Sequence, residues 1–371
     1  MISQIESMRI GGESELVADA YRGTARMKFS AIHADRNCLW MDTGRAALFV
    51  AAKAIRSRGG KPCVWVPAYS CESISQPLLQ AGFSIRYYHA GSDLGCGESA
   101  LPQPKPGETL LFIHYFGHYN VRMATAAREF RAAGVWIIED CAQASLMAGT
   151  GKCADFTITS YRKVLPVVDG SALLCEAPIS LTEIGLEIAP PDETFISAKL
   201  MGKFLRGAST DAPDFLPLIE MSELRLQNQV IPHHISWLST WMMERLDWDA
   251  AIAKRRTNWL ALSAQLKVPE LEGKVTQVFT KLKDDEVPLG LSIRVAGGQR
   301  GHLRHFLAGR NIYCPIHWPL KHLPGGEPFP DDRELAAAEL TLPTDQRMSV
   351  KHIDRLAAEV VSFFNRAQSA Q

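Results

Sequence analysis

Asp140 and Lys163 are the two residues whose types and positions point most directly to catalytic chemistry. Asp140 follows the apolar run 135–138, which predicts a buried parallel strand that stops at Glu139 and Asp140. Lys163 comes just after the β-rich run 155–160. Because ligands of open α/β sheets bind beyond the carboxyl ends of the strands, we expect a carboxylate and an amine at these two ends to face one ligand.

This pair of groups suits pyridoxal 5'-phosphate as a cofactor. A lysine amine forms a Schiff base with the cofactor's aldehyde, and a carboxylate keeps the pyridine nitrogen protonated so that the ring accepts electrons. We therefore predict that Lys163 is the Schiff-base lysine and that Asp140 pairs with the ring nitrogen. Glu139 is expected to be a supporting or solvated residue.

The stretch Asp42-Thr43-Gly44-Arg45 opens a predicted helix that continues through Arg56. Either Asp42 or Thr43 can cap it, and Gly44 lets the backbone approach a ligand closely. A helix start with free amides and a hydroxyl is a natural phosphate site, so Thr43, Gly44 and Arg45 are candidate cofactor-binding residues. An ordinary capped helix explains the same pattern.

Length and composition describe a globular protein with no strong charge bias. The 371 residues suggest two domains, and 40 basic residues balance 40 acidic ones, so neither nucleic acid nor a membrane surface is expected as a partner. Eight cysteines without a CxxC pair suggest reduced, buried thiols and a cytoplasmic location. No leader pattern and no apolar run of membrane-spanning length is present.

Strands and helices alternate along most of the chain. In the first half, the runs 62–67, 82–88 and 109–116 predict strands, and 123–133 predicts a helix before the strand at 135–138. This alternation predicts an α/β fold with a mostly parallel, doubly wound sheet. A tryptophan-rich helical pattern then runs from 235 to about 266, and a strand at 289–294 and a last helix from 350 follow. We place a domain boundary near residue 235, where the tryptophan-rich pattern begins, giving domains of residues 1–235 and 236–371.

Five segments resemble the DegT/DnrJ/EryC1/StrS family in the family's own order. They are Ile10-Gly11-Gly12-Glu13, Thr43-Gly44-Arg45-Ala46-Ala47-Leu48, Val66-Pro67-Ala68-Tyr69, Ile138-Glu139-Asp140-Cys141-Ala142-Gln143-Ala144 and Leu340-Thr341-Leu342-Pro343. The fourth is the most specific, since it is similar to the family's Ile-Glu-Asp-Ala-Ala-Gln-Ala segment. The resemblance covers nearly the whole chain.

The resemblance implies a PLP-dependent transferase of the aspartate aminotransferase-like fold, fold type I. A large PLP-binding domain with an N-terminal arm would precede a smaller C-terminal α/β domain. The implied activity is transfer of an amino group from an amino acid donor, usually glutamate in this family, to a keto acceptor, mostly a nucleotide-linked keto sugar. Fold-type I enzymes build each active site between two subunits, so a homodimer with shared sites is also implied.

Carried over by position, the resemblance assigns roles to further residues. Gln143 would reach the ring hydroxyl, Ser160 the phosphate, and the amides of Gly44 and Arg45 would hold the same phosphate. Lys163 would also move the proton between the substrate carbon and the cofactor.

Three features depart from the family pattern. Ser160 and Lys163 are three residues apart where the family has five, and 165–170 replaces a Gly-Glu-Gly-Gly turn, so Arg162 could take over part of the phosphate charge. The position expected to stack on the ring is Cys71, with Tyr69 or Tyr115 as alternatives. The asparagine lent by the partner subunit aligns with Asn228.

Four residues are candidates for contact with substrate. Arg294, in a predicted strand, could pair with the donor carboxylate or lie at the surface. His317 aligns with a substrate-side segment, although a packed histidine beside Trp318 explains it equally well. Tyr69 and His114 are expected to line the pocket, and His114 lacks the companion ligands that a metal site would need.

Other functions remain open. A sugar dehydratase of the same family would carry histidine in place of Lys163. A PLP-binding regulatory protein without turnover is compatible with the altered loop after Lys163. A generic nucleotide-binding module would require a GxGxxG after the first strand, which the sequence lacks.

Overall fold

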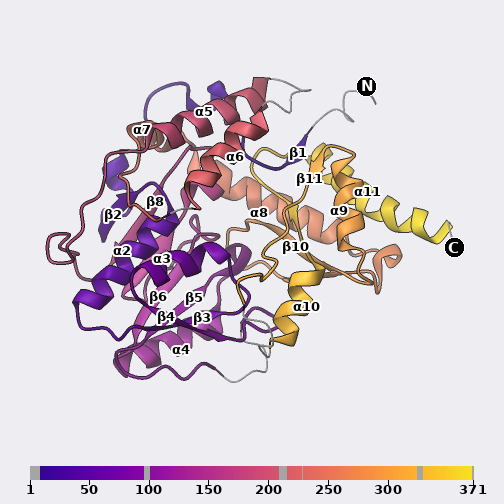
Figure 1. Cartoon of the computed structure of the whole chain (residues 1–371). Coiled ribbons are helices and arrows are strands. Elements are labelled where there is room, and N and C mark those ends of the chain that lie inside the picture. The colour runs from indigo at the N-terminus through magenta and orange to yellow at the C-terminus, as the bar shows by residue number, and fades with distance from the viewer. Residues whose placement is uncertain (1–8, 96–100, 209–214, 228, 324–328, 370–371) are drawn as a thin grey trace.

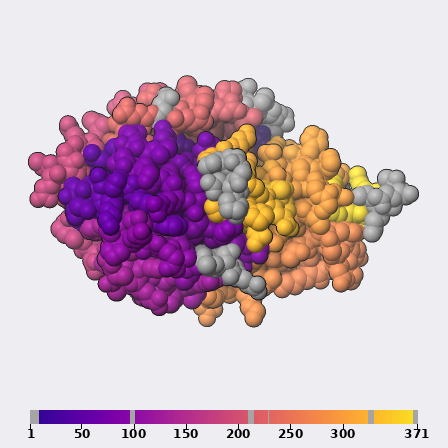
Figure 2. Space-filling view, turned by 60° about the horizontal axis from the view of Figure 1, so that its bottom comes forward, coloured from indigo at the N-terminus to yellow at the C-terminus, as the bar shows by residue number. Residues whose placement is uncertain are grey.

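The computed structural model describes residues 9–95, 101–208, 215–227, 229–323 and 329–369. An N-terminal part holds a seven-stranded sheet, and a C-terminal part, from helix α8 onward, holds a three-stranded sheet (Figure 1). The two parts lie side by side along the long dimension of the molecule, with the indigo-to-magenta and orange-to-yellow halves in broad contact (Figure 2).

The seven-stranded sheet confirms the predicted α/β architecture with mostly parallel strands. Its order is β2-β8-β7-β6-β5-β3-β4, with β7, β6, β5, β3 and β4 parallel and β8 antiparallel to both neighbours. The strands are β2 (Asn37–Met41), β3 (Cys63–Pro67), β4 (Ser84–Tyr88), β5 (Thr109–Ile113), β6 (Trp136–Cys141), β7 (Phe156–Thr159) and β8 (Ser171–Cys175).

Strand β6 is longer than expected. It runs through Glu139 and Asp140 to Cys141, whereas the apolar pattern predicted that it would stop at the two carboxylates. The backbone of both residues pairs with strand β7, where Glu139 lies opposite Thr157 and Asp140 lies opposite Ile158. Glu139 and Asp140 therefore lie within the carboxyl-terminal end of strand β6.

Helices cover both faces of this sheet. Helix α2 (Gly44–Ser57) packs its alanine-rich buried face on one side together with α3 (Ser75–Gln80). Helix α4 (Val121–Ala132) packs on the other face, as does α7 (Trp237–Arg245) nearer to β8. A layer of helices on each side explains why the central strands are apolar throughout.

The C-terminal part has its own core. Strands β9 (Val275–Gln277), β10 (Gly290–Val295) and β12 (Glu339–Pro343) form an antiparallel sheet. Helices α8 (Trp248–Gln265), α9 (Arg300–Ala308) and α11 (Val350–Ser369) cover it, and Trp259 and Leu262 of α8 lie in the shared core. The remaining helices are α5 (Glu193–Ala208), α6 (Phe215–Arg225) and α10 (Pro330–Ala338), with short 3-10 turns between elements.

The single tryptophan-rich helix predicted from 235 to about 266 is wrong. Two helices, α7 and α8, occupy this stretch. Leu246 adopts an extended conformation that ends α7, and the Asp247 side chain accepts from the Ala250 amide to cap α8. The break lets α7 pack on the N-terminal part while α8 enters the C-terminal core. The predicted domain boundary near residue 235 stays a prediction.

The N-terminal arm crosses to the C-terminal part. Strand β1 (Ile10–Gly11) pairs in parallel with β11 (Ile312–Tyr313), so the start of the described chain joins an element 300 residues away. Among the described helices, none has both the length and the apolar character needed to cross a bilayer.

Replacing Gly117 by alanine tests how closely the two parts pack. A Cβ at Gly117 would lie 2.0 Å from the carbonyl oxygen of Val287, and the glycine has a φ of +82°. Gly59 is the matched control, because its φ is +85° but nothing lies within 4 Å of its Cβ position. We expect Gly59→Ala to cost about 1–2 kcal/mol from the backbone conformation alone. Gly117→Ala should cost clearly more in urea unfolding, and equal losses would contradict the close packing.

Candidate active site

A cavity of about 600 Å³ lies between the two parts, beyond the carboxyl ends of the central strands. Residues from distant segments line it, including the arm at 11–14, Cys71 after β3, Gln143 after β6 and Lys163 after β7. The far wall comes from the C-terminal part, through residues 313–318 and 341–347 among others. The sheet therefore places its strand ends on one ligand-sized space, as the sequence predicted.

Lys163 lines this cavity, and Asp140 lies close enough to it for the lysine charge to act on the carboxyl group. The short 3-10 turn Tyr161–Lys163 turns the chain back directly after Ser160, so three residues suffice to reach the cavity. Burial raises the pKa of Asp140, and the charge of Lys163 lowers it, as does the Ala142 amide that donates to Oδ1 at 2.7 Å. Among the described residues, no donor contacts the other oxygen, Oδ2. Asp140, which is 9% exposed, thus keeps one carboxylate oxygen that no donor of the described residues contacts.

Gln143 presents a hydrogen-bond donor to the cavity. Its Oε1 accepts the Phe116 amide at 2.8 Å, which fixes the orientation of the side chain. The amide nitrogen, whose hydrogens have no acceptor in the described part of the chain, is then the polar group that remains for a ligand. An anionic oxygen is the partner that such a donor suits.

The start of helix α2 lies next to Ser160. The Thr43 side chain accepts from the Ala46 amide at 3.3 Å and caps the helix, as predicted. The amides of Gly44 and Arg45 have no acceptor among the described residues. A Cβ at Gly44 would lie 3.9 Å from the Cβ of Ser160. Two free amides at a helix start, beside a serine hydroxyl, form a cradle for an anion.

The guanidinium groups near this cradle are held by other partners. Arg45 donates to the Leu226 carbonyl oxygen, and Arg162 donates to Glu223 at 2.9 Å. Burial lowers the pKa of Arg45, and the nearby charge of Arg162 lowers it further. Neither guanidinium is therefore a free cation that could by itself hold an anion at the helix start. Asn228 lies outside the described residues.

The aromatic candidates for ring stacking differ in position. Tyr69 and Tyr115 are buried. The Tyr69 hydroxyl donates to the carbonyl oxygen of His317 at 2.7 Å, and the Tyr115 hydroxyl donates to the carbonyl oxygen of Tyr69 at 2.6 Å. Cys71 and Trp318 line the cavity instead. Tyr69 therefore holds the backbone of His317 in place. Its predicted contact with substrate stays a prediction.

His114 and Arg294 lie away from the cavity wall. His114 is fully buried; its Nε2 contacts Glu139 at 2.7 Å and its Nδ1 accepts the Asn120 amide at 2.9 Å. Both ring nitrogens are occupied, which gives its predicted role in the pocket no support. Arg294 donates to the Ser92 carbonyl oxygen, and its Nε is buried without a partner. Its role toward a donor carboxylate stays a prediction.

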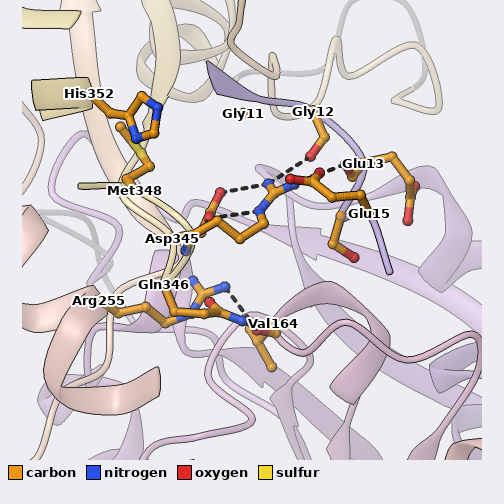
Figure 3. A network of polar contacts seen from close by, with 12 residues as sticks. Gly11, Gly12, Glu13, Glu15, Val164, Arg255, Asp345, Gln346, Met348 and His352 are labelled. Carbon is orange, nitrogen blue, oxygen red and sulfur yellow. Dashed lines mark hydrogen bonds and ion pairs between the residues drawn. The ribbon is translucent and has the colours of Figure 1, made fainter. Parts of the chain in front are cut away.

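Sequence reasoning missed the residues that hold the cavity together. Arg347 contacts Asp345 at 2.7 Å and donates to the arm carbonyl of Glu13 at 3.2 Å. Figure 3 shows Asp345 facing the arm residues Gly12, Glu13 and Glu15. Arg255 and Gln346 both donate to the Val164 carbonyl oxygen, at 2.9 and 3.0 Å. These contacts tie the arm, and the residue after Lys163, to the C-terminal part. No local motif marks these residues, because they lie far apart in the chain.

Buried ion pairs anchor the arm on its other side. The fully buried Lys203 contacts Glu13 at 2.7 Å, and Lys199, also fully buried, contacts Glu13 at 3.4 Å and Glu223 at 2.6 Å. Burial by itself would raise the pKa of Glu13, but the two lysines together hold it at about 2. Since an unpaired buried lysine is costly, Glu13 is needed to keep this wall of the cavity in place.

Glu13→Gln is expected to destabilise the protein in a pH-dependent way. The folded pKa of Glu13 is lowered, so its stabilising contribution is complete above about pH 4.5 and is lost as the pH falls toward 2. Urea unfolding should therefore show a difference between wild type and Glu13→Gln that is large at pH 6 and shrinks by pH 3. Glu334→Gln, at an exposed position of α10, is the control. A difference that stays constant with pH would contradict the ion-pair account.

Comparison with known proteins identifies aminotransferases among the structural neighbours. No model of a protein family matches the sequence, and neither does any curated protein. Among solved structures, the aminotransferase TlmJ from Streptoalloteichus hindustanus is similar with a TM-score of 0.67 at 16% identity, over 97% of this chain and 100% of that one. The PLP form of the sugar aminotransferase Spr1654 from Streptococcus pneumoniae gives 0.67 at 14%, over 97% and 99%.

A DegT DnrJ EryC1 StrS aminotransferase from Brucella abortus is also similar, with a TM-score of 0.57 at 16% identity over 88% of this chain and 86% of that one. These neighbours are aminotransferases of the type that the sequence motifs resemble. The chain therefore has the fold of the DegT/DnrJ/EryC1/StrS sugar aminotransferases.

Proposed function

We propose that the protein is a PLP-dependent aminotransferase that moves an amino group from an amino acid donor to a keto acceptor. The observation that carries the proposal is that Lys163 lines the cavity while Asp140, at the end of the adjacent strand, lies close enough for the lysine charge to lower its pKa. The donor set also fits pyridoxal 5'-phosphate: Asp140 Oδ2 lacks a partner, Gln143 offers an amide donor, and the start of α2 offers free amides. Structural neighbours include sugar aminotransferases in PLP and PMP forms.

Each residue has a defined task in this proposal. When bound, the cofactor supplies an electron-accepting ring that stabilises negative charge on the substrate carbon. Asp140 would keep a proton at the ring nitrogen, and Gln143 would donate to the ring oxygen. The amides of Gly44 and Arg45 and the hydroxyl of Ser160 would bind the phosphate.

Lys163 is the proposed base at the reacting carbon. Its amine would hold the cofactor, and when free it would take and return the proton at the substrate carbon. The positive charge of Lys163 and burial keep His317 neutral, with a pKa lowered to about 3. Because the imidazole of His317 is neutral, it does not repel the charged amine of Lys163.

We propose glutamate as the amino donor and a nucleotide-linked keto sugar as the acceptor. The sugar aminotransferases among the structural neighbours support the acceptor class. Arg304 and Arg347, at the cavity's lining, give it a cationic character that suits acidic substrates. Arg294 is retained as a candidate for the donor carboxylate. A cytoplasmic location fits such a metabolic role.

We further propose that the protein works as a homodimer. Helices α5, α6 and α7 expose large apolar side chains, among them Trp237 at 75% exposure. The others are Met201, Phe204, Leu216, Met221 and Leu224. Exposed apolar surface of this kind is typical of protein interfaces. Sedimentation at micromolar concentration should give a dimer that Trp237→Glu weakens, and a wild-type monomer would contradict the proposal.

The activity is tested by adding PLP to purified protein and recording its visible absorption spectrum. Wild type should show a protein-bound cofactor band that glutamate converts to the amine form, whereas Lys163→Ala should lack the band. Lys152→Ala, at an exposed position, is the control and should behave like wild type. Asp140→Asn should retain the band but slow the conversion roughly 100-fold, since it removes the charge that holds the ring proton.

The outcomes separate the alternatives. A Lys163-dependent band that no amino donor changes would contradict transamination and favour a PLP-binding regulatory protein. The absence of any Lys163-dependent band would reject the site itself.

A further inference from the structure

His317 is held by the protein at three of its four polar groups. Its backbone amide donates to Glu339 Oε2 at 3.0 Å, and its carbonyl oxygen accepts from the Tyr69 hydroxyl at 2.7 Å. Its ring Nδ1 lies 2.9 Å from Thr341 Oγ1. The fourth group, Nε2, has no partner among the described residues, and the residue lines the cavity. The side chain is 15% exposed. The contacts thus fix the imidazole and leave Nε2 as the ring nitrogen available to a ligand in the cavity.

Glu339 is the residue on which these contacts converge. It is fully buried on β12 and accepts from the Thr341 hydroxyl at 2.6 Å, the Ser292 hydroxyl at 3.0 Å and the His317 amide at 3.0 Å. Both carboxylate oxygens are therefore acceptors of protein donors. None of the tasks assigned above to Asp140 or Lys163 uses Glu339, so its burial calls for a separate explanation.

The directions of these hydrogen bonds determine the His317 tautomer. A hydroxyl has one hydrogen, and Thr341 commits it to the Glu339 carboxylate, which can only accept while it is ionised. Thr341 Oγ1 must then accept from the imidazole, so the proton of the neutral ring lies on Nδ1. The lone pair lies on Nε2. A ring with the opposite tautomer would place two lone pairs against each other at 2.9 Å.

Above about pH 7, an ionised Glu339 and a neutral His317 ring are present together. Burial raises the pKa of Glu339 to about 7, and the Thr341, His317 and Ser292 donors and the charge of Arg300 act in the opposite direction. The His317 ring faces the charge of Lys163. Phe116 packs edge-on against the ring with centroids 5.2 Å apart, which restricts its rotation.

We propose that Glu339 and Thr341 are positioning residues that hold His317 in the Nδ1–H tautomer, so that Nε2 presents a hydrogen-bond acceptor to the cavity. A ligand with a hydroxyl or amine hydrogen at this point is selected over one with a carbonyl or carboxylate oxygen there. The identity of that ligand rests on the proposed function, whereas the tautomer does not.

Nuclear magnetic resonance of protein labelled with 15N-histidine tests the inference directly. Two-bond 1H–15N correlations distinguish the two neutral tautomers, and His317→Gln assigns the signal. The spectra are recorded at pH 8.5, where Glu339 is ionised. Wild type should show the Nδ1–H form of His317, and Thr341→Ser should preserve it because the hydroxyl remains.

Glu339→Gln gives the sharpest contrast. The His317 amide requires an acceptor, so the carboxamide oxygen of Gln takes that side and its NH2 faces the two hydroxyls. Thr341 then accepts from the NH2 and donates its own hydrogen to Nδ1, which switches His317 to the Nε2–H tautomer. Thr341→Val, of nearly the same shape, removes the acceptor of the Nδ1 hydrogen and should leave His317 in a mixture of both forms.

Three results would overturn the inference. They are an Nε2–H tautomer in wild type, an unchanged Nδ1–H tautomer in Glu339→Gln, or an unchanged single tautomer in Thr341→Val. Unfolding of Glu339→Gln would leave Thr341→Val as the deciding variant, since it keeps the contacts of Glu339 to Ser292 and to the His317 amide. The measurement needs neither cofactor nor substrate, so it can succeed even where transamination fails.

Discussion

The placement of Lys163 near the buried carboxyl group of Asp140 is the constraint on which the proposed site depends. Burial alone disfavours an ionised Asp140, and the charge of Lys163 acts against that penalty. Both groups owe their positions to the parallel pairing of β6 and β7, which sets Asp140 opposite Ile158. A slip of one residue would turn the Asp140 side chain to the other face of the sheet.

The rest of the structure closes a cavity that Lys163 lines. The arm contributes one wall, and the C-terminal part contributes another through His317 and Arg347. Val164, next to Lys163, accepts from two side chains of the C-terminal part. Movement of one part against the other would therefore disturb the lysine directly. This linkage explains why so many buried ionic contacts gather around an arm that has only a two-residue strand.

Local patterns were sufficient to predict the sheet and the start of α2, because apolar runs and helix caps are encoded by neighbouring residues. The joint role of Asp140 and Lys163 toward one ligand stays a prediction. The long helix predicted through Leu246 failed because helical spacing does not reveal that Asp247 caps a second helix. The other walls of the cavity could not be predicted, since Arg255, Thr341 and Arg347 reach it only through tertiary packing. The hydrogen-bond chain from Glu339 to His317 likewise depends on a strand pairing between β10 and β12 that no motif specifies.

The central claim, that Lys163 is the residue that bonds to the cofactor, is tested most directly by chemical trapping. Borohydride reduction of the protein with PLP makes a lysine–cofactor bond permanent, and peptide mass mapping then locates it. The account predicts the added mass on Lys163 and on none of the other lysines, the buried Lys199 and Lys203 included. A cofactor trapped on a different lysine, or bound without any lysine modified, would contradict it.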